Sequence, residues 1–283
     1  MNISEHDIRS MVAEVVRGLG VGTASPASAA PVPAGSPTVS AGAGEGIFPD
    51  LESAIQAADK AFREYRETPV SVRKAMIRKI RDISVEYSER LAEMAVNETG
   101  FGNLCAKTTK NQLAARKTPG VEDVEAAAYT DEHGLTLIER APYGVIGSII
   151  PSTNPAATVI NNSISMLSGG NTVVFHPHPG AKNVSNFAIT LMNKAIREAG
   201  GPANCVVGLT TPTMDSASVL MKHKKIAILV VTGGPAVVAA AMNSGKKTIG
   251  AGPGNPPCVV DETADIAKAR SEEHTSELQS HHP

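Results

Sequence analysis

The chain has 283 residues, of which 42% are hydrophobic, and its 26 basic and 28 acidic residues leave it close to neutral. Such a composition supplies the core of one large or two ordinary domains. The charge balance argues against nucleic acid and against an anionic membrane surface as partners. Aromatic residues make up only 3% and tryptophan is absent, which favours an aliphatic α/β interior. No apolar run is long enough to span a membrane and the N-terminus lacks a signal-type core, so we predict a cytoplasmic protein.

The first 19 residues show apolar side chains at helical spacing, with Ser4 as a possible N-cap and Gly20 as a stop. Residues 20–46 are almost entirely small residues and proline, which cannot bury enough apolar surface to fold, so we predict a disordered linker. The helix is either a frayed terminus or a peptide that docks its apolar face on a partner. The linker favours docking, because an element that packed on its own domain would not need such a tether.

Residues 48–128 show apolar side chains three and four positions apart and are predicted to be helical, with Gly100 as a C-cap. From Tyr143 onward, short apolar runs alternate with helical patterns. We expect strands over 143–151, 172–177, 205–209, 226–234 and 256–262, and helices over 155–167, 181–200, 213–223 and 235–245. Repeated βαβ units of this kind predict an α/β fold with a parallel sheet covered on both faces, and ligands at the carboxyl ends of its strands.

Four turns that leave these strands are rich in polar or small residues: 151–155, 176–180, 231–235 and 250–255. A Gly-Gly turn that leads into a helix suits a phosphate, although most such turns are only tight turns. The "GAGPGN" turn precedes a strand and lacks a final glycine, so it does not fit a dinucleotide fingerprint. His176 and His178 have no Cys, Asp or Glu partner nearby, and we predict no metal site.

In order and spacing these turns resemble the aldehyde dehydrogenase superfamily over residues 47–269. The segments "LIERAPYGVIG", "APYGVIGSIIPSTNP", "GGNTVVFHPHP", "VTGGP" and "GKKTIGAGPGNPPCVVDETADI" are similar to the CoA-acylating branch that acts on acetaldehyde or propionaldehyde inside bacterial microcompartments. The resemblance implies N-terminal helices and a Rossmann-like cofactor domain over 47–269. It also implies that residues 1–19 are an encapsulation peptide that docks on a shell protein and places the enzyme in the microcompartment lumen.

The resemblance implies that the side-chain amide of Asn154 stabilises the oxyanion of a tetrahedral intermediate. The alternative role of Asn154 is turn formation before Pro155, for which serine or aspartate would serve equally well. The implied cofactor is NAD, with NADP left open because His176 stands where hydrolytic relatives carry a ribose-binding lysine. The implied cofactor-binding residues are Pro151, Ser152, Thr153, His176, Pro177, Thr232, Gly233, Gly234, Val237 and Gly252.

One departure from the hydrolytic relatives concerns residues 250–253, which match a turn whose glutamate activates water in those enzymes. The chain has Gly250, Ala251, Gly252 and Pro253 there. Without a carboxylate, water is a poor nucleophile, whereas a thiol deprotonates far more readily. The departure therefore favours acyl transfer to coenzyme A.

The family mechanism also requires a cysteine nucleophile. Three widely spaced cysteines predict neither a disulfide framework nor a metal knuckle, and Cys105, Cys205 and Cys258 lack a neighbouring base and the expected place in the chain. Residues 270–283 look like translated sequencing adapter, so we expect the authentic sequence to end near Ala269. The chain is then a fragment without its nucleophile, and inactive alone.

Three functions follow in order of preference. The first is an acylating aldehyde dehydrogenase that uses a small aldehyde, NAD and coenzyme A, and forms a homo-oligomer when full length. The second is a catalytically dead nucleotide-binding or microcompartment-docking protein. The third is a hydrolytic aldehyde dehydrogenase, which the missing glutamate disfavours.

Overall fold

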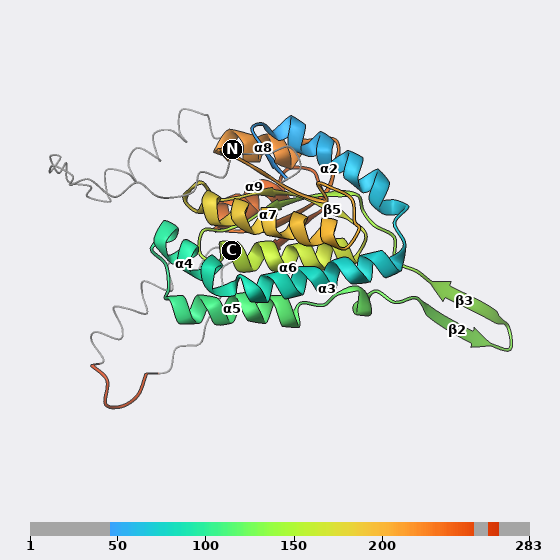
Figure 1. Cartoon of the computed structure of the whole chain (residues 1–283), viewed down its shortest axis with the longest axis horizontal. Helices are drawn as coiled ribbons and strands as arrows, with labels where there is room; N and C mark the ends of the chain where they lie inside the picture. Colours follow the sequence, from blue (N-terminus) through green and yellow to red (C-terminus); the bar gives the residue numbers. More distant parts are fainter. Residues whose placement is uncertain (1–45, 252–259, 266–283) are drawn as a thin grey trace, which may run out of the picture. The chain divides into compact units, whose positions relative to one another are not determined.

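The computed structural model describes residues 46–251 and 260–265 (Figure 1). All of these belong to one compact unit, Ala41–Pro283. The predicted docking helix at 1–19, the predicted linker before residue 46, Gly252, Cys258 and the predicted tail at 270–283 lie outside the described residues.

A six-stranded sheet with only parallel pairs forms the centre of this unit, in the order β1-β6-β5-β4-β7-β8. Its strands are β1 (Ile47–Phe48), β4 (Val145–Ile149), β5 (Thr172–His176), β6 (Val206–Leu209), β7 (Ile226–Thr232) and β8 (Thr248–Ala251). Every residue of β4, β5 and β6 is buried, as expected for parallel strands covered on both faces. The predicted α/β fold is therefore confirmed.

Helices cover both faces of the sheet (Figure 1). They are α2 (Leu51–Arg66), α3 (Val70–Glu86), α4 (Ser88–Thr99), α5 (Leu104–Lys117), α6 (Pro155–Ser168), α7 (Lys182–Glu198), α8 (Met214–Lys222) and α9 (Pro235–Met242). Two short 3-10 turns occupy Val121–Asp123 and Pro179–Ala181. None of the described helices is long and apolar enough to cross a membrane.

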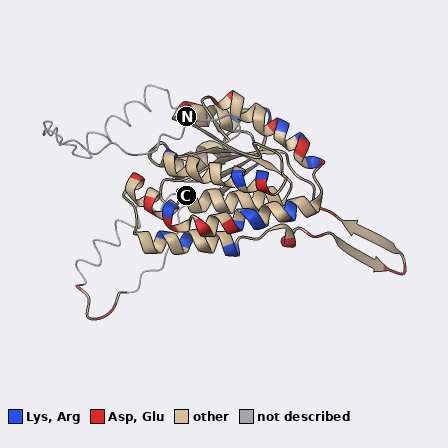
Figure 2. Ribbon diagram, in the orientation of Figure 1, with Lys and Arg blue, Asp and Glu red and all other residues tan. Residues whose placement is uncertain are grey.

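The core consists of two clusters, one on each face of the sheet. Alternate residues of β5 separate them, since Val173 and Phe175 pack with α3, α6 and α7, whereas Val174 packs with α2 and α8. Charged residues of both signs lie on the outer helices, and none lies on the strands of the central sheet (Figure 2). The predicted alternation of strands and helices thus buries apolar residues on both faces.

Local sequence signals set several helix ends. The Asp50 side chain accepts a hydrogen bond from the Ser53 amide at 2.8 Å and caps α2. Gly100 ends α4 in the left-handed conformation at φ 70°, as predicted for a C-cap. The start of α7 is capped from outside the helix, because the Glu98 carboxylate accepts the amides of Asn183 and Val184 at 2.9 and 2.8 Å.

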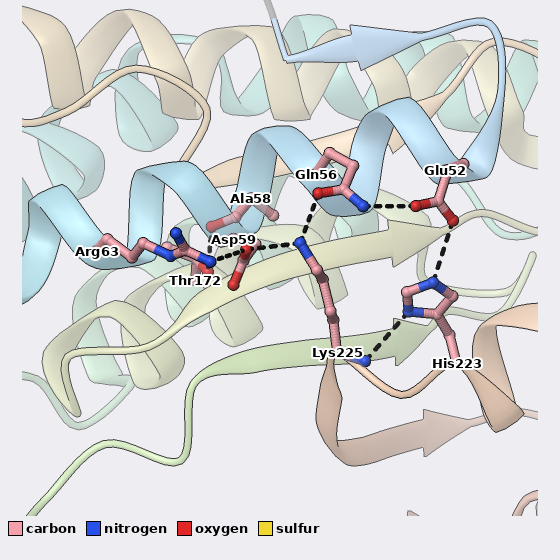
Figure 3. Close-up of polar contacts among 8 residues, drawn as sticks. All are labelled: Glu52, Gln56, Ala58, Asp59, Arg63, Thr172, His223 and Lys225. Atoms are coloured by element: carbon pink, nitrogen blue, oxygen red, sulfur yellow. Dashed lines mark hydrogen bonds and ion pairs between the residues drawn. The ribbon is translucent and has the colours of Figure 1, made fainter.

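A polar network fastens α2 to the segment that leads into β7 (Figure 3). The Lys225 ammonium donates to Gln56 at 2.5 Å and to Asp59 at 2.7 Å. Arg63 also bonds Asp59, at 2.9 Å, and lowers the pKa of that carboxyl together with the stronger effect of Lys225. His223 contacts Glu52 at 3.1 Å, so that three residues of α2 (Glu52, Gln56 and Asp59) engage two residues before β7. This network lies at the amino end of β7, opposite the strand ends that carry the polar turns.

Three elements differ from the sequence prediction. Gly250 and Ala251 lie in β8, where we predicted a turn, because their backbone pairs with Val231 and Thr232 of β7. The strand predicted over 256–262 lies largely outside the described residues, and residues 260–262 are not in a strand. The chain also forms an unpredicted antiparallel hairpin from β2 (Ala127–Asp131) and β3 (Gly134–Ile138), which extends away from the helices in Figure 1.

Candidate functional site

The predicted polar turns follow four strands that are neighbours in the sheet, in the order β5-β4-β7-β8. Because these strands are parallel, their carboxyl ends lie along one edge. Ile149 pairs with His176 on one side and Val231 on the other, and Thr232 pairs with Ala251. The structure therefore brings the strand ends preceding all four turns together.

The strand order also has a reversal point. Numbered along the chain from β4, the five strands read 3-2-1-4-5, so the chain moves outward from β4 to β6 and then returns to place β7 on the other side of β4. In doubly wound sheets, ligands bind outside the carboxyl ends at such a reversal. The turns after β4 and β7 flank this position.

The turn after β4 ends at Asn154, which precedes Pro155 in the first position of α6. The backbone carbonyl of Asn154 accepts from the amide of Thr158 at 3.1 Å. Its side chain makes no capping bond to α6, and its Oδ1 instead accepts from the ammonium of Lys110 at 3.0 Å. The side chain therefore does more than form the turn, although its role as an oxyanion donor stays a prediction.

A second lysine of α5 holds the same turn. The ammonium of Lys107 donates to the backbone oxygen of Thr153 at 2.7 Å, and only 8% of the Lys107 surface is exposed. Burial, and then the charge of Lys110, lower the pKa of Lys107. The other predicted residues of the turn, Pro151 and Ser152, are half-buried. Sequence reasoning missed both lysines, because nothing local in α5 indicates contact with a turn more than 40 residues away.

His176 lies at the end of β5 and is buried, with 4% of its surface exposed. Its Nε2 lies 2.7 Å from Oγ of Ser216, in the first turn of α8. Burial lowers the pKa of His176 to about 4. The oxygen of Ser216 also accepts from the amide of Thr213 at 2.9 Å and lies 2.9 Å from the backbone oxygen of Thr213. Direct contact between His176 and a ribose stays a prediction, since Nε2 of His176 already has a protein partner.

His178, two residues further on, is exposed, and its Nδ1 accepts from the amide of Gly180 at 3.1 Å. Pro177, between the two histidines, is buried. Over residues 46–251 and 260–265, no three His, Cys, Asp or Glu side chains lie close enough together to hold a metal ion.

The turn after β7 leaves open space in front of α9. A Cβ atom built on Gly234 would meet nothing within 4 Å, and one on Gly233 would meet only Val237, at 3.9 Å. Gly234 is the N-cap residue of α9. Pro235 has no amide hydrogen and the amides of Val237 and Val238 donate to the Gly234 carbonyl at 3.1 and 3.2 Å, so in the first turn of α9 the amide of Ala236 is the one left for a ligand. Thr232 and Val237 are half-buried beside this space. The structure thus leaves space beside Gly233 and Gly234, and their contact with a cofactor stays a prediction.

Neither described thiol suits a nucleophile. Cys205 is fully buried, and burial raises its pKa to about 12, with a smaller contribution from Glu64. Cys105 is exposed near the start of α5. A protonated, buried thiol is inert, and Cys105 lies far along the chain from the place that the resemblance implies for the nucleophile.

The fold and this edge define a doubly wound, Rossmann-like α/β domain. A model of the family described as "Aldehyde dehydrogenase family" matches residues 33–278, and the chain belongs to that family. The resemblance inferred from the turns is thereby confirmed. The match includes part of the segment 270–283, so the boundary near Ala269 stays a prediction.

Two curated relatives are CoA-acylating enzymes. The chain is 50% identical over 226 residues to propanal dehydrogenase (CoA-propanoylating) from Citrobacter freundii, a match that covers 80% of this chain and 49% of the relative. It is 50% identical over 225 residues to acetaldehyde dehydrogenase (acetylating) EutE from Salmonella typhimurium, covering 79% and 48%. The chain thus spans about half the length of these relatives.

Solved structures agree. A propionaldehyde dehydrogenase from a fucose utilisation bacterial microcompartment of Clostridium phytofermentans matches with a TM-score of 0.74 and 50% identity, over 80% of this chain and 52% of the other. A propionaldehyde dehydrogenase from Rhodopseudomonas palustris, with bound CoA and an acylated cysteine, matches with a TM-score of 0.74 and 46% identity, over the same shares.

Proposed function

We propose that the chain supplies the cofactor-binding half of a CoA-acylating aldehyde dehydrogenase. The reaction converts an aldehyde, NAD⁺ and coenzyme A into acyl-CoA, NADH and a proton. The observation that carries the proposal is the strand reversal between β4 and β7, flanked by the Asn154 turn and the open Gly233–Gly234 turn, in a chain 50% identical to CoA-acylating enzymes.

In this proposal, different residues at the carboxyl edge of the sheet bind the diphosphate, the nicotinamide and the aldehyde oxygen. Gly233, Gly234 and the amide of Ala236 at the start of α9 bind the diphosphate, and Thr232 and Val237 border it. Pro151, Ser152 and Thr153 line the nicotinamide end, where bound NAD would supply the hydride acceptor. Asn154 donates its amide hydrogens to the oxygen of the aldehyde as that oxygen becomes an alkoxide.

The proposal assigns the nucleophile to a cysteine other than the three of this sequence. Burial raises the pKa of Cys205 to about 12, and neither Cys105 nor Cys258 has the place in the sequence that the resemblance implies. The nucleophilic cysteine would attack the aldehyde carbon and carry the acyl group until a thiol removes it. Gly252, which we also assign to the cofactor site, lies outside the described residues.

The geometry at Gly250 supports transfer to a thiol over hydrolysis. A Cβ atom on Gly250 would lie 2.7 Å from Cγ1 of Val238, so a glutamate in that position requires Val238 to move. Without that carboxylate, water lacks a general base, whereas coenzyme A ionises readily. This observation disfavours the hydrolytic alternative.

The proposal also covers self-association of the protein and its location in the cell. A hairpin with a large exposed apolar surface is poorly stable alone, which supports a homo-oligomer built through β2 and β3. Docking of residues 1–19 on a shell protein, and hence a place in the lumen of a microcompartment, rests on their apolar stripe and on the origin of the Clostridium phytofermentans enzyme. A fluorescent protein fused to residues 1–19 should concentrate in microcompartments, and diffuse fluorescence in shell-forming cells would contradict this.

A hybrid enzyme tests the activity. Residues 46–251 of this chain replace the matching residues of the Citrobacter freundii enzyme, and acetaldehyde or propanal is supplied with NAD⁺, with and without coenzyme A. We expect NADH and acyl-CoA to form together and only when coenzyme A is present. Free acid without coenzyme A would favour the hydrolytic alternative. Binding of NAD⁺ without turnover, while the unmodified Citrobacter freundii enzyme is active, would favour the binding-protein alternative.

A further inference from the structure

One helical turn of α5 presents two ammonium groups to the turn before α6. Lys107 and Lys110 are three residues apart, so they lie on the same face of the helix. Lys107 donates to the backbone oxygen of Thr153 at 2.7 Å, and Lys110 donates to Oδ1 of Asn154 at 3.0 Å. The two lysines thus bind two consecutive residues of the turn.

The chemistry of Lys110 fixes which way the amide of Asn154 faces. An ammonium group only donates hydrogen bonds, so it must face the amide oxygen and never the amide nitrogen. The NH₂ group of Asn154 therefore points away from Lys110. No other described residue accepts a hydrogen bond from this NH₂ group, and both of its hydrogens are left for a ligand.

Without Lys110, the same side chain would have a competing bond. Asparagine at the N-cap commonly turns its Oδ1 toward an amide of the second or third helical residue. Asn154 occupies the N-cap of α6 and makes no such bond. Thr158 already binds the backbone oxygen of Asn154. Two arrangements therefore remain for the side chain: a bond from a helix amide to Oδ1, or the observed bond from Lys110 to Oδ1. Lys110 selects the one that exposes the NH₂ group.

The surroundings of the two lysines add a positive potential. Lys107 is buried, and no carboxylate in the described part of the chain forms an ion pair with either lysine. They line a small hollow together with Asn154, Asn111 and Pro155. Positive charge that lacks a protein counter-ion beside an amide donor favours a negative charge on a ligand.

We propose that Lys110 is a positioning residue, which orients the amide of Asn154 so that its NH₂ group faces the reacting carbonyl oxygen. The inference rests on the proposed role of Asn154 as the oxyanion donor. It adds a charged residue from a distant helix to the machinery of the reaction.

Nuclear magnetic resonance tests the orientation in the chain itself, without any activity. The chain is labelled with ¹⁵N at asparagine, and the side-chain signals of Asn154 are assigned from their loss in Asn154→Asp. We expect Lys110→Met to shift these signals and Lys110→Arg to restore them toward the original position. Lys117→Met, at the other end of α5, should leave them unchanged. Signals of Asn154 that do not respond to Lys110→Met would overturn the proposal.

Kinetics of the hybrid enzyme test the consequence. Lys110→Met should lower kcat about tenfold, as expected for a displaced donor, with little change in the KM for aldehyde. Lys110→Arg should recover most of the loss. In an Asn154→Ala background, Lys110→Met should cost less than about twofold more, because the residue through which it acts is gone. Losses that multiply in the double variant would overturn the positioning role. A hybrid that binds NAD⁺ but never turns over defeats the proposed function alone, and the nuclear magnetic resonance result then decides the positioning.

Discussion

Nε2 of His176 lies 2.7 Å from the hydroxyl oxygen of Ser216, and this contact joins the end of β5 to the first turn of α8. Both residues lie beside the carboxyl edge of the sheet. The histidine predicted to meet the cofactor therefore also holds the first turn of α8 against the end of β5. The contact with Ser216 fixes the orientation of the His176 ring, and burial favours its neutral form by lowering the pKa of His176.

The first prediction concerns acid stability. Burial lowers the pKa of His176 from 6.5 to about 4, so the unfolded chain binds a proton at this residue that the folded chain does not bind. The contribution of neutral His176 to the free energy of unfolding is complete above pH 6.5. It is lost as the pH falls toward 4, with a total loss of about 3 kcal/mol. His176→Gln should remove this part of the pH dependence in urea unfolding measured from pH 7 to 5 (about one pH unit on either side of 6). An unchanged slope would contradict a buried, neutral histidine.

The network in Figure 3 gives a second prediction, in which stability again falls as the pH falls, here through Asp59. Lys225, and then Arg63, hold the pKa of Asp59 below its ordinary value of 3.8. A lowered carboxyl pKa stabilises the fold above the ordinary value and loses that effect as the pH falls through the folded value. Asp59→Asn should cost about 1 kcal/mol at pH 7 and less at pH 3. Asp82→Asn, on α3, is the control, because Asp82 forms no ion pair within the described part of the chain. An equal cost at both pH values would contradict the ion-pair network.

The third prediction follows from the close approach of Gly250 and Val238. Gly250→Ala would place Cβ 2.7 Å from Cγ1 of Val238 and should destabilise the chain by about 1–3 kcal/mol. A second change, Val238→Ala, should reduce that cost, since it removes the opposing methyl groups. Gly134→Ala, where a new Cβ meets nothing within 4 Å, is the control. Additive costs of the two changes at 238 and 250, measured by chemical denaturation, would rule out the clash.

Particular residues show what sequence could and could not provide. The alternation of apolar runs predicted β4 to β7 and their helices to within a few residues, because buried parallel strands are continuous apolar runs. It missed β8, since "TIGA" is short and glycine-containing and becomes a strand only by pairing with β7. The resemblance supplied Asn154 and the Gly233–Gly234 turn. Lys110 and Ser216 were missed because each reaches its partner through tertiary packing, across 44 and 40 residues of sequence.

The hairpin gives a fourth prediction. Leu135 and Leu137 are 69% and 59% exposed, and alternate residues of β3 place them on one face. If this face joins copies of the chain, Leu135→Lys with Leu137→Lys should lower the molar mass measured by light scattering and leave the melting temperature of the separated chain unchanged. Thr136→Lys, which adds charge on the opposite face of β3, is the control. A wild-type chain that is monomeric at all concentrations would contradict the homo-oligomer for these residues.

The most direct test is the binding of NAD⁺ to the chain by isothermal titration calorimetry, with Gly234→Val beside the wild type. A Cβ atom at Gly234 meets no protein atom within 4 Å, and we expect the variant to keep the stability of the wild type. It would, however, fill the space assigned to the cofactor diphosphate. We predict that the wild type binds NAD⁺ and that Gly234→Val loses at least tenfold in affinity, a change of about 1.4 kcal/mol. Equal binding by both chains, or no binding by the wild type at millimolar NAD⁺, would contradict a cofactor site at the carboxyl edge of β4 and β7.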